Sequence, residues 1–477
     1  MTSMRRGCGV LAVLVVLAAA CSGDSGGGGG DAAGAAAPTT TTAPAVATTA
    51  VPTTTTTTEP EPEPEPFPVG AAWESADIDL GADTWIRDVA AAGDTVWAVG
   101  RRDNAPLALR SVGGGPFEVV DLGPPPGSGD IVLLGAAGGV DGALILFGLR
   151  GSDCFGGLAV EGGFTRGALC RVNRGAVFAS SDGGATFTYV EPPEMVLGGR
   201  QSVDLRAAVH DGEQFVAVGT VRGPDWHARM WTSPDGVTWA AAGELRDPDG
   251  STSAIDVRHA GDTLLVHYEA HPCARDANFN TPGYVLGSDW PEHARLAAGP
   301  GPASLAPVTS ADLELVPAPR PVDCAVDDPF LLAREPYPAL RIASAGDALV
   351  VVDDSNDEAG RVAGETGVAQ RVDRSWELEM VATGDAHALI DVVDIDGRPA
   401  LLERETSGGL KRLLVTVSGD DGWSARESAS PVLRDSPLIG GAVWSGDRVV
   451  LVAHRGVDGD EQRRREILVR TSAPVDR

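Results

Sequence analysis

Lysine is almost missing from this chain of 477 residues, whose 37 basic side chains include only one, Lys411. This shortage excludes a P-loop, which needs a Gly-Lys-Ser/Thr sequence, and leaves little scope for Schiff-base chemistry. Basic residues are also outnumbered, because 67 acidic residues give the chain a formal net charge of −30. Such a chain repels phosphate backbones, so we expect no nucleic-acid partner.

Several catalytic and redox motifs are absent as well. The sequence contains no G-x-S-x-G elbow and no G-x-G-x-x-G opening a βαβ unit. Beyond the first 21 residues it has four cysteines, and none forms a C-x-x-C pair, so we expect no metal site and no cofactor. Four cysteines allow three pairings, and two structural disulfides suit an oxidising compartment. The four are Cys154, Cys170, Cys273 and Cys324.

The amino terminus has the pattern of an export signal. Arg5 and Arg6 precede an apolar stretch, 10–20, that is about half as long as a membrane-spanning helix. It is therefore interpreted as a signal-peptide core and not as an anchor. Arg5-Arg6 also permits a twin-arginine interpretation, which the residues after the pair do not favour, so the export route stays open.

The small residues 18–20 run directly into Cys21, with Leu17 one position before the usual leucine. This segment resembles the lipobox of bacterial lipoproteins. The resemblance implies lipidation of Cys21 and attachment to the outer side of the cell membrane. The alternative is an ordinary signal peptide that is cut nearby, with Cys21 incidental.

Residues 22–68 are rich in glycine, then in threonine, proline and alanine, and end in the alternating Glu-Pro run 59–66. Such a composition cannot bury a core, so we predict a disordered linker. Its prolines favour an extended polyproline II conformation, which suits a stalk between a membrane and a folded domain.

The remainder of the chain is a repeat. A Gly-Asp or Asp-Gly pair occurs seven times between short aliphatic runs, and the intervals between successive pairs are 48, 70, 50, 85, 50 and 50 residues. These dipeptides supply the positive φ angles that tight hairpins need, so each predicts two antiparallel strands. A period near 50 with two insertions predicts four strands per unit and an all-β propeller of seven blades. The pairs begin at Gly93, Asp141, Asp211, Gly261, Gly346, Asp396 and Gly446.

One aromatic residue follows each of the first six hairpins after a further strand. The seventh unit ends without one, and residues 73–80 at the other end of the repeat have the pattern of a last strand. We therefore predict that the amino-terminal strand completes the seventh blade and closes the ring. An eighth blade within the 85-residue interval is the alternative, which the proline-rich stretch 299–328 disfavours. The six aromatics are Phe117, Phe187, Trp239, Trp290, Trp376 and Trp423.

Two of these aromatics end a recognisable motif. The first consists of Ser180, Asp182, Gly184, Thr186 and Phe187. The second, one residue shorter, consists of Ser233, Asp235, Gly236, Thr238 and Trp239, and residues 418–423 form a degenerate third. Both motifs resemble the Asp-box of sialidase-like and BNR-repeat propellers. The resemblance implies a structural hairpin between the third and fourth strands of a blade, on the face opposite the substrate site, and implies no activity by itself.

Strand order then assigns the long loops to a face. The connections from second to third strand and from blade to blade lie opposite the Asp-boxes, and both long intervals contain one cysteine pair. We therefore expect a disulfide between Cys154 and Cys170 and another between Cys273 and Cys324. Loops held in this way on a rigid scaffold suit ligand binding, although stabilisation alone is an equal alternative.

Resemblance to sialidases also suggests an enzyme, since that family binds a carboxylate with three arginines and attacks with a tyrosine paired with a glutamate. The residues nearest to its arginine motifs are Arg87, Arg101, Arg102 and Asp103, which we assign to a speculative ligand face. The proline of the family motif is missing after Arg87, and no tyrosine follows Tyr337. We therefore assign no catalytic residue, and keep a sialidase-like exo-glycosidase as an alternative.

Residues 267–271 gather His267, Glu269 and His271 just before Cys273. We expect a solvated loop there and no metal site, because the spacing does not reproduce a zinc-binding helix.

Together these patterns predict a signal peptide at 1–20, a linker at 21–68 and an Asp-box propeller at 69–477. We expect a monomer, attached to the membrane by a lipid, that binds a glycan or an envelope protein. A purely structural envelope protein is a further alternative.

Overall fold

The computed structural model describes much of the chain from residue 84 onward and three residues before it. The described residues are 74–75, 78, 84–103, 105–125, 130–151, 173–192, 202–222, 227–247, 251–271, 293–316, 340–353, 365–372, 375–382, 387–395, 397–407, 410–419, 422–428, 438–445, 448–455 and 464–471. Contacts within the chain separate a unit Met1–Glu63 from a unit Pro64–Arg477, and all described residues belong to the second. The predicted signal peptide, Cys21 and the linker lie outside the described residues.

Six four-stranded antiparallel sheets each consist of four consecutive strands. The first three are β2 (Thr84–Ala92), β3 (Thr95–Arg102), β4 (Ala105–Val112) and β5 (Glu118–Val120); β6 (Asp130–Gly138), β7 (Leu144–Gly151), β8 (Asn173–Ser180) and β9 (Thr188–Val190); and β10 (Ser202–His210), β11 (Phe215–Arg222), β12 (His227–Ser233) and β13 (Ala240–Leu245). The next three are β14 (Ser251–Ala260), β15 (Thr263–His271), β16 (His293–Gly299) and β17 (Ala306–Val308); β18 (Leu340–Ala345), β19 (Ala348–Asp353), β20 (Glu365–Val372) and β21 (Ser375–Ala382); and β22 (His387–Ile395), β23 (Arg398–Ser407), β24 (Leu410–Gly419) and β25 (Gly422–Ser428).

The last sheet combines the two ends of the repeat. Its strands are β26 (Leu438–Ser445), β27 (Arg448–Arg455), β28 (Arg464–Thr471) and the short β1 (Glu74–Ser75). β1 pairs antiparallel with β28, so that Glu74 lies opposite Val469.

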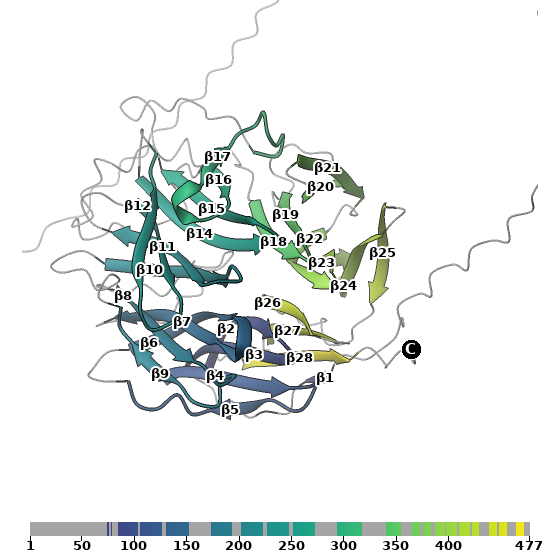
Figure 1. Ribbon diagram of the computed structural model, residues 1–477. Coiled ribbons are helices and arrows are strands. Elements are labelled where there is room, and N and C mark those ends of the chain that lie inside the picture. The colour runs from purple at the N-terminus through teal and green to yellow at the C-terminus, as the bar shows by residue number, and fades with distance from the viewer. Residues whose placement is uncertain are drawn as a thin grey trace, which may run out of the picture. The chain divides into compact units, whose positions relative to one another are not determined.

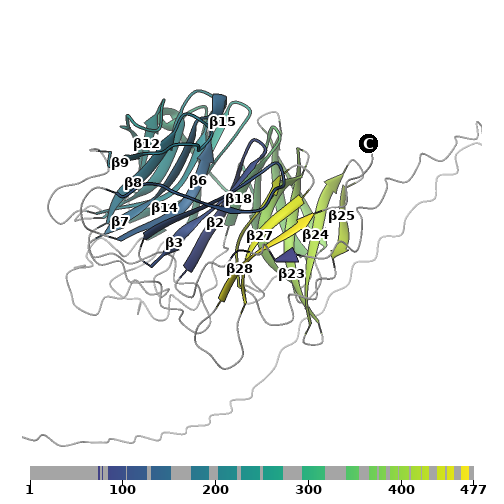
Figure 2. The same ribbon diagram turned by 90° about the horizontal axis from the view of Figure 1, so that it is seen from below.

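The first strands of successive sheets contact one another. Contacts join β2 to β6, β6 to β10, β10 to β14, β14 to β18, β18 to β22, β22 to β26 and β26 back to β2. The sheets follow one another in chain order (Figure 1), and both views show the yellow strands β27 and β28 beside β2 and β3 (Figures 1 and 2). Four-stranded antiparallel sheets arranged in this way have the architecture of β-propeller blades.

The glycine-aspartate pairs mark the turn between the first and second strand of each sheet, as predicted. Six of their glycines are described, and each has a positive φ, from 52° at Gly346 to 99° at Gly212. An L-residue with a side chain adopts this conformation only at a cost, which is why glycine recurs there.

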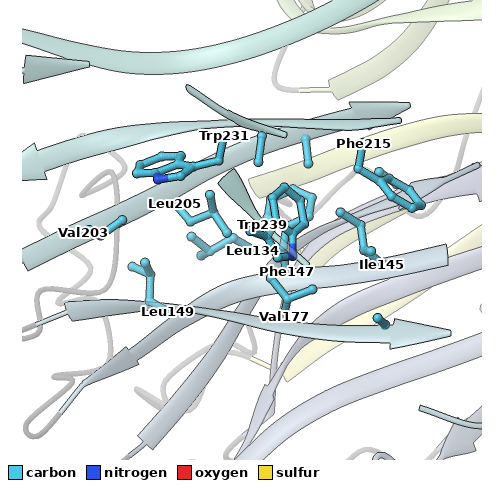
Figure 3. Packing of buried hydrophobic residues seen from close by; sticks show 14 of the residues in the cluster. Leu134, Ile145, Phe147, Leu149, Val177, Val203, Leu205, Phe215, Trp231 and Trp239 are labelled. Carbon is cyan, nitrogen blue, oxygen red and sulfur yellow. The ribbon is translucent and has the colours of Figure 1, made fainter. Parts of the chain in front are cut away.

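Buried side chains fill the space between adjacent sheets. Between the second and third sheets, Phe147 and Val177 pack with Leu205, Trp231 and Trp239 in one cluster. Figure 3 shows Trp239 lying among residues of the second sheet. Similar clusters join each sheet to the next from the first to the sixth, and join the last sheet to the first. Apolar contacts between the faces of neighbouring sheets therefore hold them together.

Two expectations need correction. Trp290 lies outside the described residues, but in the chain it comes before β16, the third strand of its sheet, whereas the other five aromatics come at or just before a fourth strand. The segment around His267 and Glu269 is not a solvated loop, since both residues lie on β15 and are buried. The alternation of a strand places their polar side chains on the same side as Leu265, because residues two apart share a face.

The four cysteines Cys154, Cys170, Cys273 and Cys324 lie outside the described residues. No helix among the described residues is long and apolar enough to cross a membrane.

Candidate functional site

The Asp-box hairpin of the second sheet is organised by one carboxylate. Asp182 accepts hydrogen bonds from the backbone N–H of Thr186 at 2.9 Å, from its hydroxyl at 2.6 Å, and from the Ser180 hydroxyl at 2.7 Å. These hydrogen bonds lower the pKa of Asp182 to about 2. The largest contribution comes from the Thr186 hydroxyl, and smaller ones come from the Thr186 N–H and the Ser180 hydroxyl. Both carboxylate oxygens accept hydrogen bonds from within the hairpin, so the carboxylate has a structural environment.

The second Asp-box repeats this arrangement in the third sheet. Asp235 accepts the N–H groups of Val237 at 2.8 Å and Thr238 at 2.7 Å, and Trp239 donates its indole N–H to the carbonyl of Gly236 at 2.8 Å. Burial would raise the pKa of Asp235, but these hydrogen bonds outweigh it and lower the pKa.

Each Asp-box glycine packs against the preceding sheet. A Cβ on Gly184 would strike the Trp97 ring, and one on Gly236 would lie 2.6 Å from the side chain of Ile145. The Phe187 ring also meets Trp97 edge-on, with ring centroids 5.8 Å apart. The two hairpins thus tie neighbouring sheets together, a role that the motif alone did not predict.

Replacing Asp235 tests this role. Asp235→Ala should lower the midpoint of thermal unfolding by several degrees, because two backbone N–H groups and the hydroxyls of Ser233 and Thr238 lose their acceptor. Asp235→Asn retains one carbonyl oxygen for the two N–H groups and should lower the midpoint less. Equal midpoints for the wild type and Asp235→Ala, measured by circular dichroism, would show that the hairpin does not need its carboxylate.

The speculative ligand face is assembled only in part. The guanidinium groups of Arg87 and Arg101 both lie over the Trp85 ring, at 5.7 and 5.8 Å from its centroid. Arg102 and Asp103 are exposed at the end of β3, and Asp103 adopts a positive φ of 48°. Sequence reasoning did not predict the stacking on Trp85.

A charged cluster lies where the first strands meet. Asp88, Asp256 and Asp391 each follow a β-bulge in β2, β14 and β22. The bulge releases the backbone N–H of the residue after each aspartate from the regular strand pairing. The aspartate carboxylate accepts this N–H, at 2.8 Å between Val257 and Asp256 and at 2.9 Å between Val392 and Asp391.

These carboxylates interact across the ring. Burial raises the pKa of Asp88 to about 7, and repulsion from the Asp391 carboxylate contributes to the shift. Attraction by the Arg258 guanidinium opposes it. The sheets that carry Asp391 and Arg258 are not neighbours of the first sheet, so these charges act on Asp88 from beyond the adjacent sheets. Burial likewise raises the pKa of Asp256 although Arg258 lies 2.9 Å away.

Hydrogen bonds between sheets occupy most of this cluster. Arg258 donates to the carbonyl of Ile342 at 3.3 Å, Arg341 donates to the carbonyl of Ile390, and Asp391 accepts the N–H of Ala442 at 3.0 Å. Each bond joins the first strand of one sheet to the first strand of the next sheet. The cluster therefore serves mainly to hold neighbouring sheets together. Among the described residues no group of histidine, cysteine, aspartate or glutamate is arranged to hold a metal ion.

A different set of charges lies opposite the Asp-boxes. The turn between β6 and β7 is hydrogen-bonded to the turn between β8 and β9, from Gly183 N to Gly142 O at 2.9 Å, so both turns share one face. The strand ends at Arg150, Arg174 and Glu191 therefore lie on the opposite face.

On that face each of three carboxylates pairs with two arginines. Glu191 pairs with Arg150 and Arg174, Asp204 with Arg206 and Arg222, and Glu244 with Arg229 and Arg246.

Six arginines therefore meet three carboxylates in the second and third sheets. Elsewhere in the described residues Arg110 pairs with Glu118 and Arg258 with Asp256.

Tyr189 belongs to the same face. Its hydroxyl donates to Glu191 at 2.7 Å and accepts from Arg150 at 3.2 Å. Burial, followed by the hydrogen bond to Glu191, raises the pKa of Tyr189 above its ordinary value. The phenol therefore stays protonated on the outermost strand of its sheet, and it is not an activated nucleophile.

No protein-family model matches the chain, and no curated protein matches it in sequence. Solved structures resemble it distantly. A Trypanosoma rangeli sialidase in complex with the inhibitor DANA is 10% identical with a TM-score of 0.36, and the match covers 75% of this chain and 56% of the sialidase. An α-L-arabinofuranosidase from Fusarium graminearum is 10% identical with a TM-score of 0.41, covering 86% of this chain and 98% of the enzyme. The β-propeller domain of the Trilobed protease from Pyrococcus furiosus is 10% identical with a TM-score of 0.41, covering 81% of this chain and 94% of that domain.

Proposed function

We propose that this chain is an exported lipoprotein whose seven-bladed propeller, closed by the amino-terminal strand, binds a ligand outside a bacterial membrane. Cys21 is the lipidated residue, residues 21–68 are the linker, and the folded part begins near residue 69. The pairing of β1 with β28 and the contact of β26 with β2 support the closed ring.

One observation carries the binding role. In a chain with 30 more acidic than basic side chains, the described part of the face opposite the Asp-boxes gathers two arginines around each of three carboxylates. Arginines gathered in this way can attract and orient a ligand of opposite charge.

Charge reversal on this face tests the proposal. Arg174 and Arg246 suit this test because their side chains are 49% and 53% exposed. The full-length protein in detergent should be retained on immobilised bacterial envelope material, and Arg174→Glu/Arg246→Glu should reduce retention at least tenfold. Arg398→Glu, an exposed position at the turn between β22 and β23, is the control and should retain wild-type binding. Retention that is independent of Arg174 and Arg246 would contradict the proposed binding face.

The lipid anchor has its own test. Cys21→Ser should move the protein from the membrane fraction to the soluble extracytoplasmic fraction, because the variant has no thiol to carry the acyl chains. Immunoblotting of separated fractions measures the change. A variant that remains membrane-bound would show that something other than Cys21 provides the attachment.

An exo-glycosidase of the sialidase type remains the alternative. It requires a nucleophile beside the substrate, and Tyr189, which is paired with Glu191, lies on the outermost strand β9 with its phenol protonated. We therefore expect no hydrolysis of a fluorogenic sialoside. Turnover that Arg87→Ala abolishes would instead favour the enzyme.

A further inference from the structure

We propose that β21 binds an extended segment of another protein, with side chains that alternate between apolar and basic, as an added strand of the fifth sheet. The site lies on the outermost strand of that sheet, whereas the ion pairs described above belong to the second and third sheets. It is therefore independent of the binding face proposed above, and either proposal can fail without the other.

The strand β21 has a long free edge. It has 8 residues, it is the outermost strand in the order β18-β19-β20-β21 (Figure 1), and among the described strands it pairs only with β20. The outermost strands of the other sheets are shorter: β5, β9 and β17 have 3 residues each, β13 has 6, β25 has 7 and β1 has 2. The edge of a strand presents unpaired N–H and C=O groups to which a further strand can bind, and proteins usually keep such edges short. Among the described outermost strands, β21 therefore offers the longest backbone template.

One side of β21 carries an apolar row, which consists of Trp376, Leu378 and Met380. These residues are two apart in the strand, so they share a face. Leu378 is 39% and Met380 52% exposed. Trp376 packs against the core cluster between the fourth and fifth sheets, so the row continues that core outward to the surface. A long edge with exposed apolar side chains is a surface on which another strand assembles.

The other side of β21 carries an acidic row, which consists of Glu377 and Glu379. Both side chains are exposed, and within the described part of the chain neither makes a hydrogen bond or an ion pair. The Glu379 carboxylate lies 3.5 Å from a Cβ built on Gly422, which places this row beside the sixth sheet.

The two rows define the chemistry of the partner. A strand that pairs with β21 places its own side chains alternately beside the apolar row and beside the acidic row. Apolar side chains cover Leu378 and Met380, and basic side chains are attracted to the glutamates. The net charge of −30 draws a basic segment toward this chain from a longer distance.

The acidic row disfavours a second copy of this chain as the partner. Antiparallel self-pairing centred on Leu378 would place Glu377 opposite Glu379 of the other copy. Centring on Glu379 would place two copies of that residue opposite each other, and centring between the two positions would place Glu379 opposite Leu378. Each of these registers sets like charges opposite each other or mixes the two rows, whereas a strand with alternating apolar and basic residues does neither.

Binding of a synthetic peptide to the full-length protein in detergent tests the proposal. The peptide is as long as β21, alternates valine and lysine and carries fluorescein, and fluorescence anisotropy gives its Kd. We expect saturable binding to the wild type. Glu377→Lys/Glu379→Lys should raise the Kd by about tenfold or more, because lysine then faces lysine, and Leu378→Asn/Met380→Asn should also weaken binding.

A matched variant and two further peptides separate strand pairing from general attraction of charges. Glu213→Lys/Asp347→Lys reverses two exposed acidic residues at turns of the third and fifth sheets, and should leave the Kd nearly unchanged. One control peptide carries N-methyl groups along its central residues, which removes the hydrogen-bond donors of both edges. The other has the same composition with its valines and lysines in two blocks. Both should bind about tenfold or more weakly than the alternating peptide.

Several results would overturn the proposal. They are an absence of saturable binding, equal binding of the N-methylated peptide, and an unchanged Kd in Glu377→Lys/Glu379→Lys. Analytical ultracentrifugation examines the second copy, because a wild type that dimerises, and that Leu378→Asn/Met380→Asn returns to a monomer, would make this chain its own partner. Thermal unfolding of each variant establishes that the substitutions act on binding and not on folding.

Discussion

Gly100→Ala should destabilise the protein by about 3 kcal/mol, although it adds a single methyl group. Gly100 lies on β3 opposite Ile86, immediately beside the bulge in β2. A Cβ built on Gly100 would lie well under 3.0 Å from the carbonyl oxygen of Trp85 and also too close to the Cα of Ile86. Both obstacles are backbone atoms, which cannot rotate away as a side chain does, so the two strands must separate.

The same arrangement recurs in the next two sheets. Gly148 faces the carbonyl of Val132, and Gly219 lies 2.5 Å, measured from its built Cβ, from the carbonyl of Asp204. Gly148→Ala should therefore behave like Gly100→Ala in urea unfolding. Gly301→Ala is the matched control, since a Cβ there meets nothing within 4 Å and φ is 178°. Wild-type stability of Gly100→Ala would mean that the bulge can shift without cost.

The hairpins could be predicted from the sequence because their information is local. A Gly-Asp or Asp-Gly pair between aliphatic runs restricts the backbone by itself, and Gly93, Gly142 and Gly212 have the positive φ that the pattern requires. The Asp-box is local in the same sense, since Asp182 binds Ser180 and Thr186 within seven residues.

The bulges and the charge clusters depend instead on residues far apart in the chain. Positions equivalent to Gly100 hold Tyr268 in the fourth sheet and Glu403 in the sixth, so the repeat does not reveal which bulge requires glycine. Asp88 on β2 and Asp391 on β22 lie far apart in the chain, and only the contacts of β22 with β26 and of β26 with β2 bring their sheets near each other. Trp290 was misplaced for a related reason, because the long insertion obscured which strand follows it.

The free energy of unfolding should fall as the pH rises from about 5 to 8. Burial raises the pKa of Glu403 to about 7, although the hydrogen bond of 3.1 Å from the Thr416 hydroxyl acts to lower it. The pKa of Asp88 is raised to about the same value. Between the ordinary carboxyl pKa and 7 the folded protein holds these protons and the unfolded chain releases them. Stability is therefore highest below pH 4 with respect to these groups and is lost as the pH passes through 7.

Neutral substitutions should reduce this dependence. Glu403 is 2% exposed, so Glu403→Gln should be more stable than the wild type at pH 8 by about 2 kcal/mol, and nearly equal to it at pH 4.5. Asp88 is partly reached by solvent at the centre of the ring, and Asp88→Asn should gain about 1 kcal/mol at pH 8.

The Asp182 carboxyl provides the opposite sign, because its lowered pKa stabilises the fold above pH 4. Asp182→Asn should therefore leave the slope between pH 5 and 8 unchanged, as measured by urea unfolding across that range. The opposite result would be a free energy of unfolding of the wild type that rises from pH 5 to 8, or a fall with pH that persists in the variant Glu403→Gln/Asp88→Asn. Either result would show that these two carboxyl groups are not held protonated in the folded state.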